Sequence, residues 1–232
     1  MNETFTITPQ FTGPPDSGNG GYVCGILGSR LDGPAQVSLR RPPPINTPLE
    51  LRTYNGGIAL FDVEALVAEA KPAEFELDIP SMPSLDKVHA AKENYAGFQT
   101  HAFPTCFVCG PDREEGDGLR VFTGPVKDAN LVAAPWTPHA SLAGPEGTVA
   151  PEFCWAAMDC PGAWAFLEPG IVVLLGTMTA QIEKTIHPCE NCIVLGWSIG
   201  SERRKRFAGT AIFNEAGELA ASSSQTWIEV SR

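Results

Sequence analysis

The sequence predicts an α+β protein in which one unit, an antiparallel sheet wrapped around a central helix, occurs twice along the chain. Each half opens with a helical candidate rich in small and apolar residues, at 19–31 in the first half and 151–159 in the second. Segments in which apolar and polar residues alternate, as in strands with one buried face, follow each helical candidate. The same order in both halves indicates a duplicated unit.

The strand candidates follow from this alternation and from turn residues. Asn55-Gly56-Gly57 supplies a tight hairpin turn between two of them. Residues 63–70 fit a helical period equally well, but the hairpin register favours a strand. The predicted strands cover 35–40, 49–54, 58–70 and 74–77 in the first half, and 177–185, 193–199, 206–213 and 219–230 in the second, with a turn at 214–217.

The repeat divides the chain into an N-terminal domain (1–78), a junction (79–131) and a C-terminal domain (132–232). The junction is rich in proline, glycine and charged residues and contains a Cys-x-x-Cys pair. Because it is longer than an ordinary connection, we expect it either to have structure of its own or to lie over a site.

Composition narrows the functional classes. The chain has 232 residues, 43% of them hydrophobic, and a formal net charge of -11. This charge repels phosphate backbones and anionic lipid, so we expect neither a nucleic-acid nor a membrane partner. The N-terminus lacks the pattern of a secretory signal, and the longest apolar stretch, 170–175, is too short to span a bilayer. Seven cysteines, an odd number, favour reduced thiols, and we expect a cytoplasmic protein.

Several short motifs, taken in order, resemble a known family. Gly18-Asn-Gly-Gly-Tyr-Val-Cys-Gly-Ile-Leu, then Ser38-Leu-Arg-Arg-Pro-Pro, then Leu49-Glu-Leu-Arg-Thr-Tyr-Asn-Gly resemble the N-terminal hotdog of type II acyl-CoA thioesterases. The C-terminal half is similar through Phe166-Leu-Glu-Pro-Gly and residues 213–225. The resemblance covers nearly the whole chain outside the junction. It implies two fused hotdog domains, an acyl-CoA or acyl-carrier thioester as substrate, no cofactor beyond the coenzyme A of that substrate, and a homodimer paired through its sheets.

The family pattern also implies catalytic residues, and this chain departs from it. Type II enzymes use an Asp on the first strand after the second helix, with a hydroxyl and a Gln on later strands. The Gln corresponds to Gln225 and the hydroxyl to Ser201, but the acid position falls near 177–179, where this chain has no acid. The strand acid of the type II pattern is therefore missing.

A second hotdog pattern supplies an acid. Phenylacetyl-CoA-type thioesterases carry His/Asn-Gly-Gly at a helix start and an acid on the opposing helix, and Asn19-Gly20-Gly21 and Asp159 are similar to these elements. Gly28 stands at the acid position of the first repeat, and Ala-Pro-Glu at 150–152 stands in place of Gly-Gly in the second. We therefore expect one working site per chain, between the two helices.

The chemistry of these residues allows a catalytic and a structural interpretation. The Gly20-Gly21 helix start offers backbone N–H groups and a positive dipole end to a thioester oxygen, although its glycines could simply permit close packing. Asp159 lies in an apolar run that would raise its pKa, as a general base requires, although Pro161 could instead make it a helix-end residue. Gln225 could orient water or face solvent, and Asp16 and Glu152 are more typical of helix caps.

Substrate contacts are assigned to a basic run and to aromatic residues. The run Arg203, Arg204, Lys205 and Arg206 could hold the phosphates of coenzyme A, although solvated hairpin residues would look the same. Arg40 and Arg41 occupy the equivalent region of the first repeat. Among the aromatic residues, Trp155, Trp164 and Phe166 suggest an apolar tunnel for the acyl group, and Tyr22 is a further candidate for substrate binding.

The cysteines do not predict a metal site. Cys106 with Cys109, and Cys189 with Cys192, have the spacing of two halves of a tetrahedral zinc site, but a long segment with a whole helix separates the pairs. We therefore expect packed thiols and no metal ligand.

Thioester hydrolysis by a carboxylate-positioned water is the function that these residues favour. A non-catalytic acyl-thioester binding or regulatory protein is the alternative, and it would tolerate Asn at position 159. A hotdog enoyl hydratase is disfavoured because that family places a His a few residues after the acid. A zinc-stabilised structural protein would carry stoichiometric metal after purification.

Overall fold

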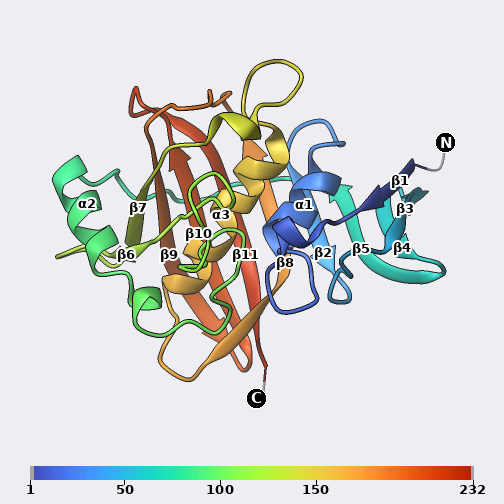
Figure 1. Cartoon of the computed structure of the whole chain (residues 1–232), viewed down its shortest axis with the longest axis horizontal. Helices are drawn as coiled ribbons and strands as arrows, with labels where there is room; N and C mark the ends of the chain where they lie inside the picture. Colours follow the sequence, from blue (N-terminus) through green and yellow to red (C-terminus); the bar gives the residue numbers. More distant parts are fainter. Residues whose placement is uncertain (1–2, 231–232) are drawn as a thin grey trace.

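A computed structural model describes residues 3–230 of the chain (Figure 1). The helices are α1 (Gly20–Gly28), α2 (Leu85–Glu93) and α3 (Pro151–Trp164), with short 3-10 turns at Pro9–Phe11, Ala96–Phe98 and Ala140–Leu142. The strands are β1 (Glu3–Thr6), β2 (Ala35–Leu39), β3 (Pro48–Tyr54), β4 (Gly57–Asp62), β5 (Ala65–Pro72), β6 (Gly124–Pro125), β7 (Val132–Trp136), β8 (Val172–Ile182), β9 (Cys192–Glu202), β10 (Lys205–Phe213) and β11 (Leu219–Val230).

Within the described residues the strands form one 11-stranded sheet in the order β1-β3-β4-β5-β2-β8-β11-β10-β9-β7-β6. The strands of the first repeat occupy one side and those of the second repeat the other (Figure 1). The repeats join edge to edge, because β2 pairs antiparallel with β8 from Ala35 opposite Ala180 to Ser38 opposite Thr177. Because β2 and β8 each pair with a strand on both sides, neither is an exposed edge strand of the sheet.

The central helices α1 and α3 lie against the same face of the sheet and against each other (Figure 1). Gly21, Gly25 and Gly28 lie on one stripe of α1, and a Cβ at any of them would overlap α3. At Gly25 that Cβ would lie 2.5 Å from the Cα of Glu152. The glycines therefore set how closely the two helices approach.

The second central helix is longer than the sequence predicts. It continues through Pro161 to Trp164, although a proline removes one N–H donor and disfavours the preceding turn. The Pro161 carbonyl accepts from Ala165 N at 3.2 Å, and β9 passes close to the helix at Gly196. Because Gly196 has no side chain, β9 can pack closely against α3 at Pro161, and this packing favours the continued helix.

Most predicted elements are observed, with the following differences. The segment predicted at 58–70 is a hairpin of β4 and β5, and the one predicted at 74–77 is not a strand. The first helix covers Gly20–Gly28 rather than 19–31. The strands β1, β6 and β7 were not predicted, because segments of two to five residues are too short for alternation to stand out.

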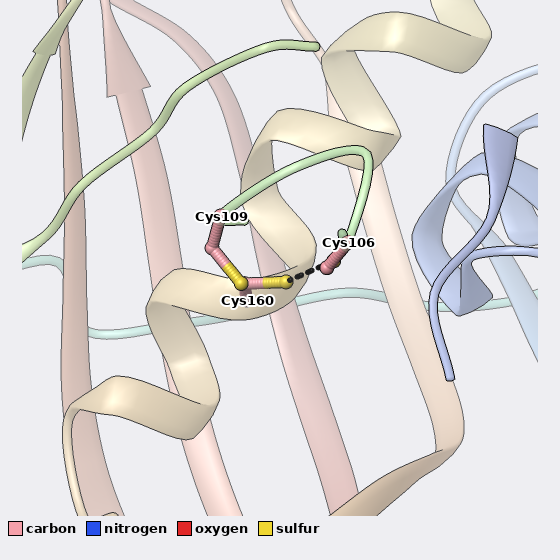
Figure 2. A group of neighbouring side chains, drawn as sticks. All are labelled: Cys106, Cys109 and Cys160. Atoms are coloured by element: carbon pink, nitrogen blue, oxygen red, sulfur yellow. Dashed lines mark hydrogen bonds between the residues drawn. The ribbon is translucent and has the colours of Figure 1, made fainter. Parts of the chain in front are cut away.

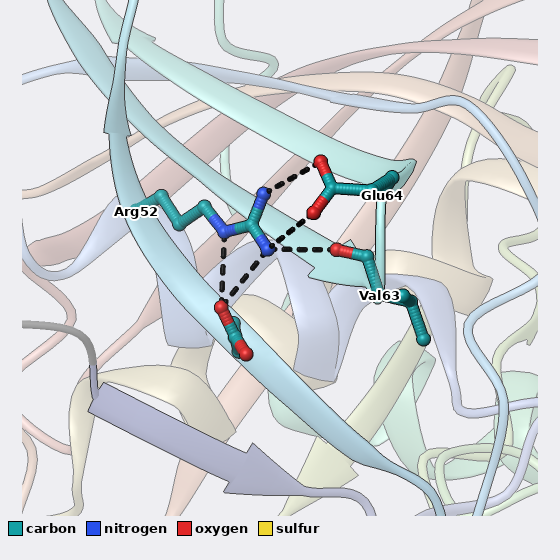
Figure 3. Close-up of polar contacts among 4 residues, drawn as sticks. Arg52, Val63 and Glu64 are labelled. Atoms are coloured by element: carbon teal, nitrogen blue, oxygen red, sulfur yellow. Dashed lines mark hydrogen bonds and ion pairs between the residues drawn. The ribbon is translucent and has the colours of Figure 1, made fainter.

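The β4–β5 turn shows why the hairpin escaped the sequence prediction. Val63 has a φ of 54°, a conformation that a β-branched residue rarely adopts, so nothing in the sequence marks a turn there. Arg52 on β3 holds it by donating from Nη2 to Val63 O at 2.7 Å and from Nη1 to Glu64 Oε2 at 3.3 Å (Figure 3). A side chain from the neighbouring strand β3 thus helps to stabilise the turn.

The junction carries α2 and β6 and covers one end of the sheet. Val88 and Ala91 of α2 are buried in a cluster with Ile193, Leu195 and Trp197 of β9. Of the helices in residues 3–230, none combines the length and the apolar character needed to cross a membrane.

Candidate active site

The Asp159 carboxylate lies at the start of α1. Its Oδ2 accepts from Gly21 N at 3.0 Å and from Asn19 Nδ2 at 2.8 Å. Asn19 is also the N-cap of α1, because its Oδ1 accepts from Tyr22 N at 2.9 Å. The cap fixes which side of the Asn19 amide faces the carboxylate, so the first turn of α1 holds Asp159 through two donors.

Burial changes the acidity of this carboxyl group. Asp159 is 2% exposed, and its Oδ1 has no hydrogen-bond partner within residues 3–230. Burial raises the pKa of Asp159 to about 7, against the lowering effect of the bonds from Gly21 and Asn19. A carboxyl group with such a pKa can exchange a proton near neutral pH.

A largely apolar cavity of about 410 Å³ opens beside the carboxylate. Asn19, Gly20 and Asp159 line one part of it. Its size and apolar wall suit a small organic ligand with an apolar part. The apolar wall includes Leu39, Ala163, Trp164, Leu167, Leu175 and Trp227.

The position on α1 that corresponds to Asp159 on α3 has no space for a ligand. Gly28 is the ninth residue of α1, as Asp159 is the ninth of α3. The ideal Cβ of Gly28 would lie 2.5 Å from Cζ2 of Trp155, so the indole ring occupies the space beside it. Gly28 supplies no acid and Trp155 fills the space, so within residues 3–230 the carboxylate-lined cavity between the helices is the one beside Asp159.

Tyr22 and Trp155, which the sequence assigns to substrate binding, lie in the core and do not line the cavity. Tyr22 stacks on Phe11 with ring centroids 4.2 Å apart, and Trp155 packs against Gly28. The sequence could not separate them from Trp164, which does line the cavity, since all three are aromatic residues on the same two helices.

The basic run is also displaced from the cavity. Arg203, Arg204 and Arg206 lie at the β9–β10 hairpin, and Arg206 pairs with Glu229. Ser201 is exposed and lies opposite Arg206 in the register, so it does not approach Asp159 either. None of these four residues lines the cavity.

Arg40 and Arg41 line the cavity instead. They follow β2, the strand that pairs with β8, and so stand beside the cavity wall that β8 provides. Arg40 is paired with Glu69 and its side chain is 54% exposed. In the sequence, Arg40 and Arg41 occupy the region of the first repeat that is equivalent to the basic run of the second. This equivalence was the signal that could have identified them as cavity residues.

Gln225 is buried beneath α3 and does not line the cavity. Its Nε2 donates to Met158 O at 2.6 Å and to Ser223 Oγ at 3.1 Å, and its Oε1 accepts from Trp227 Nε1 at 2.8 Å. Gly162 on α3 leaves the space that the Gln225 side chain occupies. In this arrangement Gln225 ties α3 to β11, and both of its polar atoms are hydrogen-bonded to protein groups.

Replacing Gln225 by methionine is expected to lower the free energy of unfolding by about 1–3 kcal/mol, because Met158 O and Trp227 Nε1 lose their partners. Urea denaturation measures this loss. Gln36→Met is the control. Gln36 is half-buried and donates to Thr179 Oγ1, so its replacement should lower the free energy of unfolding by less. If Gln225→Met leaves stability unchanged yet abolishes an established activity, the residue acts in the chemistry.

The two Cys-x-x-Cys pairs do not meet. Cys189 is exposed and Cys192 begins β9, whereas Cys106 and Cys109 lie against α3 beside Cys160. The zinc site considered from the two pairs together is therefore absent from residues 3–230, and a different set of thiols is assembled.

Comparison with known proteins identifies the fold. No family model matches the sequence, and no curated protein matches it. The tesB protein of Mycobacterium avium subsp. paratuberculosis superposes with a TM-score of 0.66 at 12% identity, covering 99% of this chain and 93% of that chain. A hot dog fold protein of unknown function from Alicyclobacillus acidocaldarius gives 0.62 at 9% identity, covering 100% and 94%. A thioesterase II candidate from Thermobifida fusca gives 0.64 at 13% identity, covering 99% and 92%.

These likenesses extend over the whole chain and define its class. The protein has a double hotdog fold, in which two helix-wrapping units share one sheet. The prediction of two fused hotdog domains in an α+β chain is confirmed. The domain limits at residues 78 and 131 stay predictions.

Proposed function

We propose that this protein hydrolyses an acyl thioester, with coenzyme A as the thiol, in the cavity beside Asp159. One observation carries the proposal. A buried carboxylate with one oxygen held by two donors and the other without a partner faces an apolar cavity at the N-terminus of a helix. A group buried at such desolvation cost is typical of a functional site.

The residues divide the reaction between them. Oδ1 of Asp159 accepts a proton from a water molecule, whose oxygen attacks the thioester carbonyl carbon. The C–S bond then breaks, and the departing sulfur takes the proton back from Asp159, which restores the carboxylate. Gly21 N–H is engaged by Asp159, so the helix-start amide that remains for the thioester oxygen is that of Gly20, which lines the cavity. Asn19 and Gly21 position the carboxylate.

The test is a screen of free-thiol release over a panel of acyl-CoA esters that vary in chain length and aromatic content. Turnover of at least one ester, with saturation kinetics, is the expected result. A panel that binds without any thiol release would contradict hydrolysis.

Arg41 is expected to contact the phosphates of coenzyme A, since it lines the cavity and carries a positive charge in an acidic protein. Arg41→Ala should raise KM for an acyl-CoA by roughly 3- to 10-fold with little change in kcat, as loss of uniform binding predicts. Arg204→Ala is the matched control, because Arg204 does not line the cavity. Equal effects of the two substitutions would show that the cavity arginine has no special role.

A non-catalytic acyl-thioester binding protein is the second candidate. The observation that favours it is the placement of Gln225, which does not line the cavity and whose polar atoms are hydrogen-bonded to α3 and β11. Calorimetry with a non-hydrolysable acyl-CoA analogue separates the candidates when combined with the thiol-release screen. Binding without turnover, unchanged by Asp159→Asn, supports the second candidate.

The family resemblance also leads us to propose a homodimer. Multi-angle light scattering of the purified chain tests it directly, with a mass of about twice 24.8 kDa as the expected result. A mass equal to one chain across the accessible concentration range would contradict pairing.

A further inference from the structure

Three thiols converge beside α3 (Figure 2), and all three residues line the cavity. Cys106 and Cys109 come from the junction loop, and Cys160 comes from α3, one residue after Asp159. Their sulfur atoms all lie within 4.8 Å of one another, and all three residues are buried. Cys106 Sγ and Cys160 Sγ are 3.7 Å apart, much farther than the roughly 2.05 Å of a disulfide.

We propose that Cys106, Cys109 and Cys160 bind one thiophilic divalent metal ion, with Zn²⁺ as the expected occupant. Zinc bound to thiolates has Zn–S distances of about 2.3 Å, which places two sulfurs of a tetrahedral site about 3.8 Å apart. The 3.7 Å separation of Cys106 Sγ and Cys160 Sγ agrees with that spacing. Soft sulfur ligands select such an ion over magnesium or calcium.

The loop that carries the first two thiols is a tight turn, which brings Cys106 and Cys109 to the same place. Gly110 N donates to Cys106 O at 2.9 Å and closes the turn. A Cβ at Gly110 would lie 2.6 Å from Cys106 N, so the turn requires glycine.

His101 supports the cluster from outside. Its Nε2 is 3.3 Å from Cys109 Sγ, and its Nδ1 accepts from Phe103 N at 2.9 Å. A neutral ring that accepts at Nδ1 carries its proton on Nε2, so His101 donates to the Cys109 sulfur and is not itself a ligand in this arrangement. The three thiols also line the cavity, so the fourth position of the ion is available to a water or a small ligand.

The metal would connect the junction to the candidate active site. Cys160 follows Asp159 on α3, and Cys106 Sγ lies 3.9 Å from Asn19 Nδ2, the donor that holds the Asp159 carboxylate. An ion bound by all three thiols would fix the loop at 106–109 against α3. The covering role expected for the junction would then depend on the metal.

The test is metal analysis of untagged protein purified with a thiol reductant. About one zinc per chain is expected in the wild type, falling at least tenfold in Cys160→Ser and in Cys106→Ser. Cys189→Ser is the matched control and should keep its zinc, because Cys189 is exposed and outside the cluster. Asp159→Asn should keep it too, so that the metal site is tested separately from thioester hydrolysis.

Cobalt titration covers the case in which a cysteine variant does not fold. Co²⁺ added to the reduced, metal-free wild-type protein should produce the sulfur-to-metal charge-transfer absorption of a thiolate site at one equivalent, and Zn²⁺ should abolish it. The proposal is overturned if the wild type binds neither ion after reduction. Retention of zinc by a folded Cys160→Ser variant would overturn it equally.

Discussion

Asp159→Asn is expected to lower kcat for thioester hydrolysis by about 100- to 10,000-fold, the usual contribution of a positioned general base. Asparagine is nearly isosteric, and its carbonyl oxygen can still accept from Gly21 N and Asn19 Nδ2. Its amide cannot take a proton from water. Thiol-release kinetics measure the loss, and thermal unfolding should show stability equal to or above that of the wild type, since no carboxyl group is then buried without a partner.

Asp16→Asn is the control for this substitution. Asp16 is exposed and has a φ of 60°, which asparagine also tolerates, so the fold should be unaffected. Its kcat should remain within a factor of about two of the wild type. If Asp159→Asn turns over substrate as fast as Asp16→Asn, the proposed general base is wrong, whatever the fold.

Gly21→Ala is expected to destabilise the protein by about 3 kcal/mol or more, a large effect for the addition of one methyl group. The new Cβ would overlap the Cβ of Asp159 and lie 2.9 Å from the carbonyl oxygen of Trp155. Both obstacles belong to the body of α3, so only a separation of the helices relieves them. Chemical denaturation measures the loss, and a folded remainder should also lose activity because Asp159 would move.

Gly200→Ala is the matched substitution at a glycine where the added methyl group has space. No atom lies within 4 Å of its ideal Cβ, and Gly200 is exposed on β9. Its unfolding free energy should stay within about 0.5 kcal/mol of the wild type. A similarly small effect of Gly21→Ala would show that the α1–α3 contact is looser than the structure describes.

The predictability of the site differs from residue to residue. Asn19, Gly21 and Asp159 were predicted because few residue types can cap a helix, allow a close approach or carry a buried charge. Arg203 and Tyr22, which the sequence assigns to the substrate, do not line the cavity, and arginines and aromatic residues are common on surfaces and in cores. The residue type alone therefore does not indicate whether such a side chain lines the cavity.

The sequence by itself determined the repeat, the order of helix and strands in each unit, and the pairing of an Asn-Gly-Gly start in one unit with an acid in the other. These follow from periodicity and from residue types with narrow conformational or chemical uses, which are local properties of the chain. Only the tertiary structure decided that Trp155 fills the second position, that Arg41 lines the cavity and that Cys160 joins Cys106 and Cys109. Each depends on how α1, α3 and the junction pack, and distances between remote segments are set by that packing and not by their spacing in the sequence.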